Sequence, residues 1–345
     1  MLYNNKIDVI IPVYNAPDEM LFKCLSSIAC QEIIEDIEVT IVDDASNIET
    51  NYQKVADNFK SMMKINILRY DINGGPGVAR QYGIDHTSNE FITFIDVDDT
   101  FNGAFALKAL RGGIQLNDNQ YQVCIGVFDE IFTEKIPNGQ TFLIAHEEDL
   151  VWMFGKMYRR SFIEKYDIHF HATSRANEDN GFNAQVQLYT HDLNLINFIS
   201  THVYIWHENL DSITRKNNCN YTFGDAKRDS FYGYVENMIF AIKEVQRKNI
   251  PDRMEVIKSF AVVVMIKLYQ YYIECYAKAN QYAANNFEYC KKYYNELYQF
   301  LEKEISTEFF TQHYSELMTT FYAQGKFDNI VPHMSIQEFL RKLKR

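Results

Sequence analysis

The first hundred residues alternate between short apolar runs and segments with helical spacing. The apolar runs are rich in β-branched residues and predict four strands, at residues 7–14, 37–42, 65–68 and 91–95. After the second strand comes a polar helix, for which we expect Val55, Phe59 and Met62 to face inward. Strands joined in this way by helices and short loops predict a parallel, doubly wound α/β sheet.

Polar or glycine residues follow each of these predicted strands. Ligands of such sheets bind beyond the carboxyl ends of the strands. We therefore expect one site to collect the strand-end residues Tyr14, Asp43, Asp44, Gly74 and Asp96.

The fourth strand ends in a dense group of carboxylates. Asp96, Asp98 and Asp99 follow Phe91–Ile95 within four positions. Burying that much negative charge is costly unless a cation compensates it. Asp-x-Asp is a suitable set of oxygen ligands for Mg²⁺ or Mn²⁺, and an acidic surface turn is the alternative.

Taken together, the strand-end segments resemble glycosyltransferase family 2, a group of inverting nucleotide-sugar enzymes with the GT-A fold. The matching segments are residues 10–15 (Ile-Ile-Pro-Val-Tyr-Asn), 41–46 (Ile-Val-Asp-Asp-Ala-Ser), 73–80 (Asn-Gly-Gly-Pro-Gly-Val-Ala-Arg) and 94–99 (Phe-Ile-Asp-Val-Asp-Asp). The resemblance covers roughly the first two-thirds of the chain. It implies a Rossmann-like mixed sheet flanked by helices, here followed by an all-α appendage.

The resemblance implies a nucleotide-binding role for residues of the first three segments. They are Pro12 and Tyr14 beside the base, Asp43 and Asp44 at the uracil or ribose, and Asn73, Gly74 and Arg80 beside the base and diphosphate. For Arg80, a structural ion pair with Asp43 or Asp96 is the alternative.

The fourth segment matches the family's metal-binding D-x-D motif. The resemblance makes Asp98 the direct ligand of Mn²⁺ or Mg²⁺ and places Asp96 nearer the ribose, with Asp99 as either a supporting or a solvated carboxylate. His207 is a candidate third ligand or diphosphate contact, although a packing role is the more common one for a lone strand-end histidine.

Two later segments resemble the acceptor side of the family's cleft. In residues 152–160, Lys156 would contact the donor sugar or diphosphate, and a strand with a solvated basic end is the alternative. Glu178 and Asp179 match the family's Glu-Asp pair at the start of a helix. Asp179 would be the base that takes the proton of the acceptor hydroxyl, and Glu178 would orient the acceptor or a neighbouring basic group. Ordinary N-terminal carboxylates of a helix are the alternative.

The segment at residues 203–215 resembles the family's tail motif. Its Ser212-Ile-Thr stretch would close over the diphosphate, and Arg215 would neutralise the leaving group. Upstream, residues 131–142 predict a hairpin with a turn at Asn138-Gly139.

From about residue 225 the strand patterns give way to helical ones. We predict a catalytic domain at residues 1–222 and a helical domain at 223–345, whose last helix opens with a capping box, Ser335 to Glu338. A bundle packed on the catalytic domain is the simplest reading. An acceptor-binding module or a homo-oligomer formed through these helices is the alternative.

Charge and composition limit the kinds of partner and the cellular compartment that we expect for this protein. The net charge of −12 disfavours broad binding to nucleic acid, which needs a basic surface. The six scattered cysteines fit reduced thiols. No signal peptide is predicted, because Met1 to Asn5 is polar and leads directly into a strand. No transmembrane segment is predicted, because the longest apolar run is only Phe260–Ile266. We expect a cytoplasmic protein, with peripheral association at the inner membrane face left open.

The predicted function is a metal-dependent inverting glycosyltransferase. It would move a sugar from a nucleotide-diphosphate donor, with a UDP-sugar favoured, to an acceptor hydroxyl in bacterial surface glycan synthesis or phage-related modification. The alternatives are a catalytically silent scaffold that binds a nucleotide-sugar or glycan, and a transferase acting on modified nucleic-acid bases. A sugar nucleotidyltransferase is disfavoured, because the loop after the first strand, Asn15–Asp18, lacks glycine and positive charge.

Overall fold

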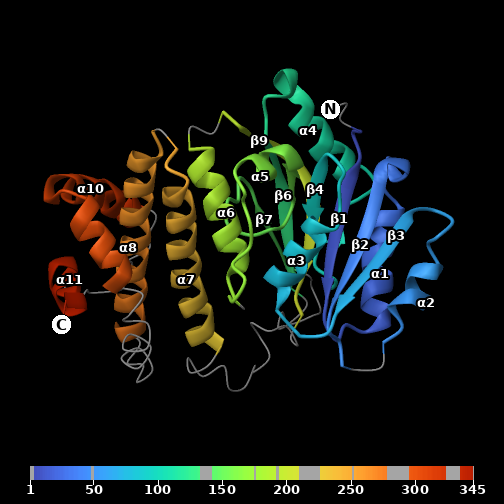
Figure 1. The fold of residues 1–345 in the computed structure, drawn as a ribbon, viewed down its shortest axis with the longest axis horizontal. Helices are drawn as coiled ribbons and strands as arrows, with labels where there is room; N and C mark the ends of the chain where they lie inside the picture. The colour runs from blue at the N-terminus through green and yellow to red at the C-terminus, as the bar shows by residue number, and fades with distance from the viewer. Residues whose placement is uncertain are drawn as a thin grey trace. The chain divides into compact units, whose positions relative to one another are not determined.

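The protein divides into two compact units, Met1–Leu210 and Asp211–Arg345. The computed structural model describes residues 4–47, 50–132, 142–174, 176–191, 194–209, 226–250, 252–277, 295–323 and 335–344 (Figure 1). The predicted domain boundary at residue 222 lies outside the described residues.

One mixed sheet forms the centre of the first unit. Its strands run in the order β3-β2-β1-β4-β8-β6-β9-β5, and β7 pairs with β6 at the side. Their bounds are β1 Ile7–Val13, β2 Ile37–Asp44, β3 Lys64–Tyr70, β4 Phe91–Phe94, β5 Thr100–Phe101, β6 Val123–Phe132, β7 Phe142–His146, β8 Lys156–Arg159 and β9 Ile196–His207. The predicted fold class, a mixed sheet flanked by helices and followed by further helices, is confirmed.

The sheet has a parallel half and a mostly antiparallel half. Strand β1 pairs in parallel with both β2 and β4, and β2 pairs in parallel with β3. Beyond β4 the direction changes, because β8 is antiparallel to both β4 and β6. The predicted hairpin is confirmed by the antiparallel pairing of β6 with β7, and its turn lies outside the described residues.

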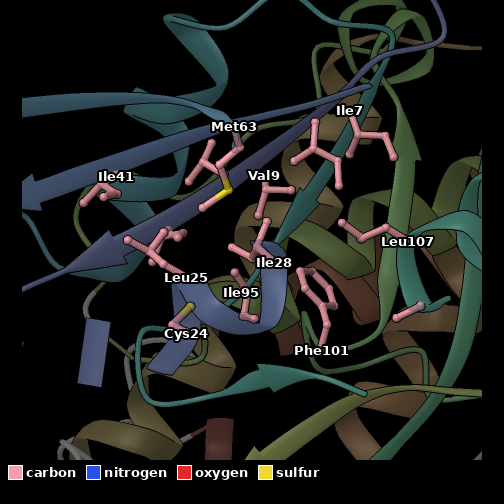
Figure 2. Close-up of a cluster of buried hydrophobic side chains, with 14 of the residues drawn as sticks. Ile7, Val9, Cys24, Leu25, Ile28, Ile41, Met63, Ile95, Phe101 and Leu107 are labelled. Atoms are coloured by element: carbon pink, nitrogen blue, oxygen red, sulfur yellow. The ribbon is translucent and has the colours of Figure 1, made fainter. Parts of the chain in front are cut away.

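Helices pack on the two faces of this sheet. They are α1 Asp18–Ala29, α2 Tyr52–Asp57, α3 Pro76–Asp85, α4 Ala106–Asn119, α5 Arg160–Lys165 and α6 Glu178–Tyr189, with a short 3₁₀ turn at Ile34–Asp36. Figure 2 shows a core cluster in which Leu25 and Ile28 of α1 lie beside Val9 of β1. The next residue of β1, Ile10, points the other way and contacts Gly83 of α3, as the two-residue period of a strand requires.

The predicted inward face of the second helix is partly wrong. Val55 and Phe59 are buried as expected, but Met62 is 51% exposed and Met63 is buried in its place. The helical period does not extend that far because α2 ends at Asp57.

The second unit is helical in its described part. Its helices are α7 Ala226–Arg247, α8 Arg253–Ala277, α10 Thr307–Ala323 and α11 Ile336–Lys344, and residues 295–304 are also helical. Buried Val235 and Val245 of α7 and Ala261 and Leu268 of α8 form part of its core. The predicted capping box is confirmed, since the Ser335 N–H donates to Glu338 at 2.8 Å and the Glu338 N–H donates to Ser335 Oγ at 3.2 Å. None of the helices in the described residues combines the length and apolarity needed to cross a bilayer.

Candidate active site

The loops after β1 and β2 meet at the carboxyl edge of the parallel strands. The backbone N–H of Asn15 donates to Ser46 Oγ at 2.9 Å, and the N–H of Asn47 donates to Asn15 Oδ1 at 2.8 Å. Tyr14 lies at this edge with 43% of its surface exposed, one residue beyond β1, and Pro12 pairs with Val42 inside the sheet. An exposed aromatic ring at this position is accessible for stacking on a planar base.

Asp44, the last residue of β2, is fully engaged by the loop that leads into α3. Its Oδ1 accepts the Gly74 N–H at 2.6 Å, and its Oδ2 accepts the Gly75 N–H at 2.8 Å and Asn73 Nδ2 at 2.9 Å. Gly75 has a φ of 89°, a conformation that favours glycine. The buried carboxylate of Asp44 therefore fixes the shape of this loop.

Asp43 is also buried and bonded within the protein. Its Oδ1 accepts the Ser46 N–H at 2.9 Å, and its Oδ2 pairs with Arg69. Arg69 also donates to the Ser46 carbonyl at 2.8 Å. No sequence pattern singles out Arg69, which reaches Asp43 because β2 and β3 are in parallel register.

Arg80 of α3 connects the two halves of the site. Its guanidinium is buried and donates to Asp96 Oδ1 at 2.6 Å and to Glu178 Oε1 at 2.6 Å. Burial alone would lower the pKa of Arg80, but Asp96 and Glu178 raise it, so the charge is held. Of the two ion pairs considered for Arg80, the structure contains the one with Asp96.

The three aspartates after β4 differ in their surroundings. Asp99 is buried, and its carboxylate accepts the Tyr204 hydroxyl at 2.6 Å and the His207 N–H at 2.9 Å, so a solvated Asp99 is excluded. Asp98 is partly exposed and accepts Asn209 Nδ2 at 2.9 Å. Burial, with Asp96 next in effect, raises the pKa of Asp98.

The chemistry of this acidic group fits a divalent cation. Burial and then Asp96 raise the pKa of Asp98, and burial and then Asp98 and Asp96 raise the pKa of Asp99. Of the three carboxylates, only that of Asp96 pairs with Arg80. His207 lies at the end of β9 with its Nε2 3.0 Å from Thr100 Oγ1, and burial lowers its pKa, which favours the neutral, ligating form. Carboxylate oxygens and a neutral imidazole are ligand types that Mn²⁺ accepts. In the described residues, however, the ligand atoms of Asp96, Asp98 and His207 do not all lie within 4.8 Å of one another, so the structure does not assemble them into a preformed metal site.

At the acceptor side, the carboxylate of Asp179 has a raised pKa. It lies in the first turn of α6, and burial raises its pKa to about 7, with Glu178 adding to the effect and Arg80 opposing it. Its Oδ1 accepts the N–H and the side-chain amide of Asn180, at 2.8 and 3.2 Å. Within the described residues no donor bonds to Oδ2.

Lys156 is buried in β8 and does not form a solvated basic end. Its Nζ binds Asp149 Oδ1 at 3.0 Å, and only 1% of the side chain is exposed. Arg159 and Arg160 are buried as well and pair with Glu90 and Asp8. The alternative of a solvated basic end is therefore wrong, because each of these cations is buried and paired with a carboxylate, which for Arg159 and Arg160 is distant in sequence.

Several residues of the site could not be assigned from the sequence, and two predicted ones lie outside the described part of the chain. Ser212 and Arg215 belong to the undescribed segment. Asp149 and Tyr204 had no motif to identify them, since each acts through a partner on another strand or loop.

Comparison with known proteins supports the resemblance to glycosyltransferase family 2. The model of the family described as "Glycosyl transferase family 2" matches residues 8–176. The chain is 27% identical over 252 residues to a poly(ribitol-phosphate) beta-glucosyltransferase of Bacillus spizizenii, covering 69% of this chain and 37% of that protein. It is 24% identical over 213 residues to poly(ribitol-phosphate) beta-N-acetylglucosaminyltransferase TarS of Staphylococcus aureus, covering 58% and 35%. The chain thus spans little more than a third of the length of these relatives.

Solved structures agree on the fold. The crystal structure of S. aureus TarS 1-349 in complex with UDP-GlcNAc matches with a TM-score of 0.62 at 18% identity, covering 98% of this chain and 90% of that one. Another crystal structure of S. aureus TarS matches with a TM-score of 0.57 at 18% identity, covering 88% and 50%. The fold is GT-A, and residues 8–176 of the chain belong to glycosyltransferase family 2.

Proposed function

We propose that this protein is a metal-dependent inverting glycosyltransferase that moves a sugar from a UDP-sugar to a hydroxyl of a bacterial surface glycan. The observation that carries the proposal is Asp179, a buried carboxylate with a pKa raised to about 7 and an oxygen that no described donor occupies. A base with a pKa near the working pH is the group that such a reaction needs.

The donor would bind at the carboxyl edge of the parallel strands. Tyr14 would lie against the base. Asp43 and Asp44 would hold the loops that shape this edge of the sheet. Asp43, or the backbone of its loop, would contact the uracil or the ribose. Gly74 and Gly75 hold the start of α3 against Asp44 through their own N–H groups, so it is the first turn of α3 beyond them that would lie toward the diphosphate. Two crystal structures of S. aureus TarS 1-349, in complex with UDP and with UDP-GlcNAc, support a uridine donor by analogy.

Asp98, Asp96 and His207 are the residues that would hold a divalent ion. When bound, Mn²⁺ or Mg²⁺ would supply positive charge for the donor diphosphate and the leaving UDP. Arg80 contributes by neutralising Asp96 and by fixing its carboxylate relative to Glu178.

The transfer itself would use the acceptor-side carboxylates. Asp179 takes the proton of the acceptor hydroxyl, and the oxygen attacks the anomeric carbon as the bond from that carbon to the diphosphate oxygen breaks. A single displacement of this kind inverts the anomeric configuration. Glu178, held by Arg80, keeps Asp179 at the start of α6 and raises its pKa. Lys156, bonded to Asp149, would act through the loop that borders the acceptor rather than on the diphosphate.

A nucleotide-sugar screen tests the proposed donor. Thermal unfolding is recorded with UDP, UDP-glucose, UDP-GlcNAc and GDP-mannose, each with and without Mn²⁺. A ligand that binds only the native state raises the melting temperature. We expect stabilisation by the uridine compounds that depends on Mn²⁺, and none by GDP-mannose. Equal melting temperatures under all conditions would contradict the proposal and favour a silent scaffold.

The predicted oligomer through the C-terminal helices, the bacterial surface acceptor and the cytoplasmic location stay predictions. The poly(ribitol-phosphate) named for the two curated relatives is one candidate acceptor class.

A further inference from the structure

A short loop between β7 and β8, residues 149–154, carries an exposed tryptophan. Trp152 has 40% of its surface exposed, although the residues on either side of the loop are anchored in the sheet. One exposed aromatic residue is ordinary on a protein surface. What distinguishes Trp152 is the number of buried polar groups that hold its backbone.

Asp149 fixes the first turn of the loop. Its Oδ1 accepts the N–H groups of Val151 and Trp152 at 3.0 and 2.8 Å. The same oxygen receives Lys156 Nζ at 3.0 Å, and this lysine is buried. Breaking the arrangement would leave a buried ammonium without its carboxylate, which is costly, so the loop conformation is strongly specified.

Helix α6 fixes the other side of the loop. Asn183 Nδ2 donates to the carbonyls of Val151 and Trp152 at 2.8 and 3.0 Å, and Gln187 Nε2 donates to the Leu150 carbonyl at 2.8 Å. Asn183 and Gln187 follow Asp179 at four and eight positions, which places all three on one face of the helix. The loop is therefore bonded to the face of α6 that begins with the proposed base.

An aromatic stack extends from Trp152 to the D-x-D aspartates. The Trp152 ring stacks on Phe154 with centroids 6.1 Å apart, and Phe154 stacks on Tyr204 at 5.1 Å. The Tyr204 hydroxyl donates to Asp99 at 2.6 Å and accepts the Asp96 N–H at 3.2 Å. Trp152 thus lies at the outer end of a packed row that reaches the proposed metal site, and its loop is bonded to α6 one turn beyond the proposed base.

We propose that Trp152 is the acceptor-stacking residue of this site, and that its indole face packs against the C–H face of a neutral sugar ring of the acceptor glycan. The proposal rests on the proposed function. A fixed aromatic side chain provides apolar contact area at little cost in conformational entropy, because its loop is already ordered.

The charges near the loop favour a neutral sugar over a phosphate-rich polymer. Glu147 and Glu148 are exposed directly before Asp149, and the chain as a whole carries a net charge of −12. A polyanion would be repelled by this surface. The proposed acceptor chemistry therefore differs from the poly(ribitol-phosphate) named for the relatives.

Kinetics with and without an acceptor separate this role from donor binding. UDP release from UDP-GlcNAc and UDP-glucose is measured alone, with chitotetraose or cellotetraose, and with ribitol-phosphate oligomers. We expect Trp152→Ala to lower kcat/KM for the neutral oligosaccharide about 10- to 100-fold, mainly through KM, with acceptor-free hydrolysis within about twofold of the wild type. Trp152→Phe restores most of the activity, and Leu143→Ala, which removes an exposed apolar side chain of β7, changes nothing.

Two outcomes of the kinetics overturn the proposal. One is unchanged oligosaccharide transfer in Trp152→Ala, and the other is transfer only to ribitol-phosphate oligomers. A wild type that releases no UDP from either donor contradicts the proposed function instead, and binding then has to be tested without turnover.

A fluorescence titration provides that test. The chain has two tryptophans, so Trp206→Phe leaves Trp152 as the sole indole. We expect its emission to shift on addition of chitotetraose or cellotetraose, and not on addition of ribitol-phosphate oligomers. Emission that stays constant with both oligosaccharides overturns the proposal, whether or not the enzyme turns over.

Discussion

The donor half and the acceptor half of the site treat their carboxylates differently. Asp44, at the end of β2, has both oxygens occupied by donors of the Asn73–Gly75 loop. Asp179, at the start of α6, has one oxygen bonded to Asn180 and one that no described donor occupies, and its pKa is raised to about 7. Both are buried, so burial alone does not separate them.

The difference teaches that hydrogen-bond satisfaction distinguishes a structural carboxylate from a candidate for chemistry. A fully bonded carboxylate fixes the backbone and is unavailable to take a proton. A buried and under-bonded one binds a proton near neutral pH. Substitutions at the two carboxylates, and at the contact between α3 and α6, test this contrast.

Replacing the proposed base should have the largest effect. We expect Asp179→Asn to lower transfer about 10²- to 10⁴-fold, because the acceptor hydroxyl loses its proton acceptor. The measurement is kcat/KM for transfer from the UDP-sugar that the thermal screen selects. Full activity in Asp179→Asn would remove this residue from the mechanism.

The pH dependence should follow the same group. A base must be unprotonated, so kcat/KM should fall about tenfold per pH unit below about pH 7 and level off above it, measured at saturating Mn²⁺. The residual activity of Asp179→Asn should lack this limb. If the limb persisted in that variant, another group would be responsible for it.

For the free energy of unfolding, we expect replacement of Asp44 to have a larger effect than replacement of Asp179, the reverse of the order for activity. Asp44→Asn loses charge-assisted bonds to the loop and turns an amide toward its donors, which should cost about 3 kcal/mol in the free energy of unfolding. Asp179→Asn should be neutral or stabilising at pH 8. The folded pKa of Asp179 is raised, so its ionised form destabilises the native state, and that penalty grows as pH rises from the unfolded pKa to about 7.

Urea unfolding of both variants at pH 8 and pH 5 checks this ranking. Equal losses of stability in the two variants would show that hydrogen-bond satisfaction does not separate the two sites.

The smallest effect on stability is expected at the contact between α3 of the donor half and α6 of the acceptor half. A Cβ at Gly77 of α3 would lie 2.9 Å from Cβ and Cγ of Glu178, so Gly77→Ala should displace Glu178 from Arg80 and cost about 1–3 kcal/mol. Gly112→Ala in α4 is the matched control, because a Cβ there meets nothing within 4 Å. Thermal unfolding of the two variants measures the difference. A Gly77→Ala variant as stable as the control would mean that the two halves adapt freely to each other.

The donor half was largely predictable from sequence. In the acceptor half, the position of Glu178 and Asp179 at the start of a helix was predictable, but the contacts of these residues were not. Parallel strands place their carboxyl ends at one edge, so the order of motifs at Tyr14, Asp44 and Asp96 sufficed to predict an assembled site. The bridge from Arg80 to Glu178 joins residues 98 positions apart, and no local pattern encodes it.

The burial of Lys156 is a second feature that no local sequence pattern predicts. A basic residue at a strand end is more often solvated, and only the contact with Asp149, seven positions away and across a turn, explains its burial. Met62 and Met63 are a further example at the level of a single helix, where the end of α2 decided which side chain faced the core.

We propose separate roles for the donor half and the acceptor half of the site: Asp98 binds the metal that holds the diphosphate, and Asp179 accepts the proton of the acceptor hydroxyl. Calorimetric titration of UDP with and without Mn²⁺ into the wild type, Asp98→Asn and Asp179→Asn tests these roles most directly. We expect Mn²⁺-dependent UDP affinity in the wild type and in Asp179→Asn, and loss of this affinity in Asp98→Asn. UDP affinity that is independent of Mn²⁺ in the wild type, or lost equally in both variants, would contradict them.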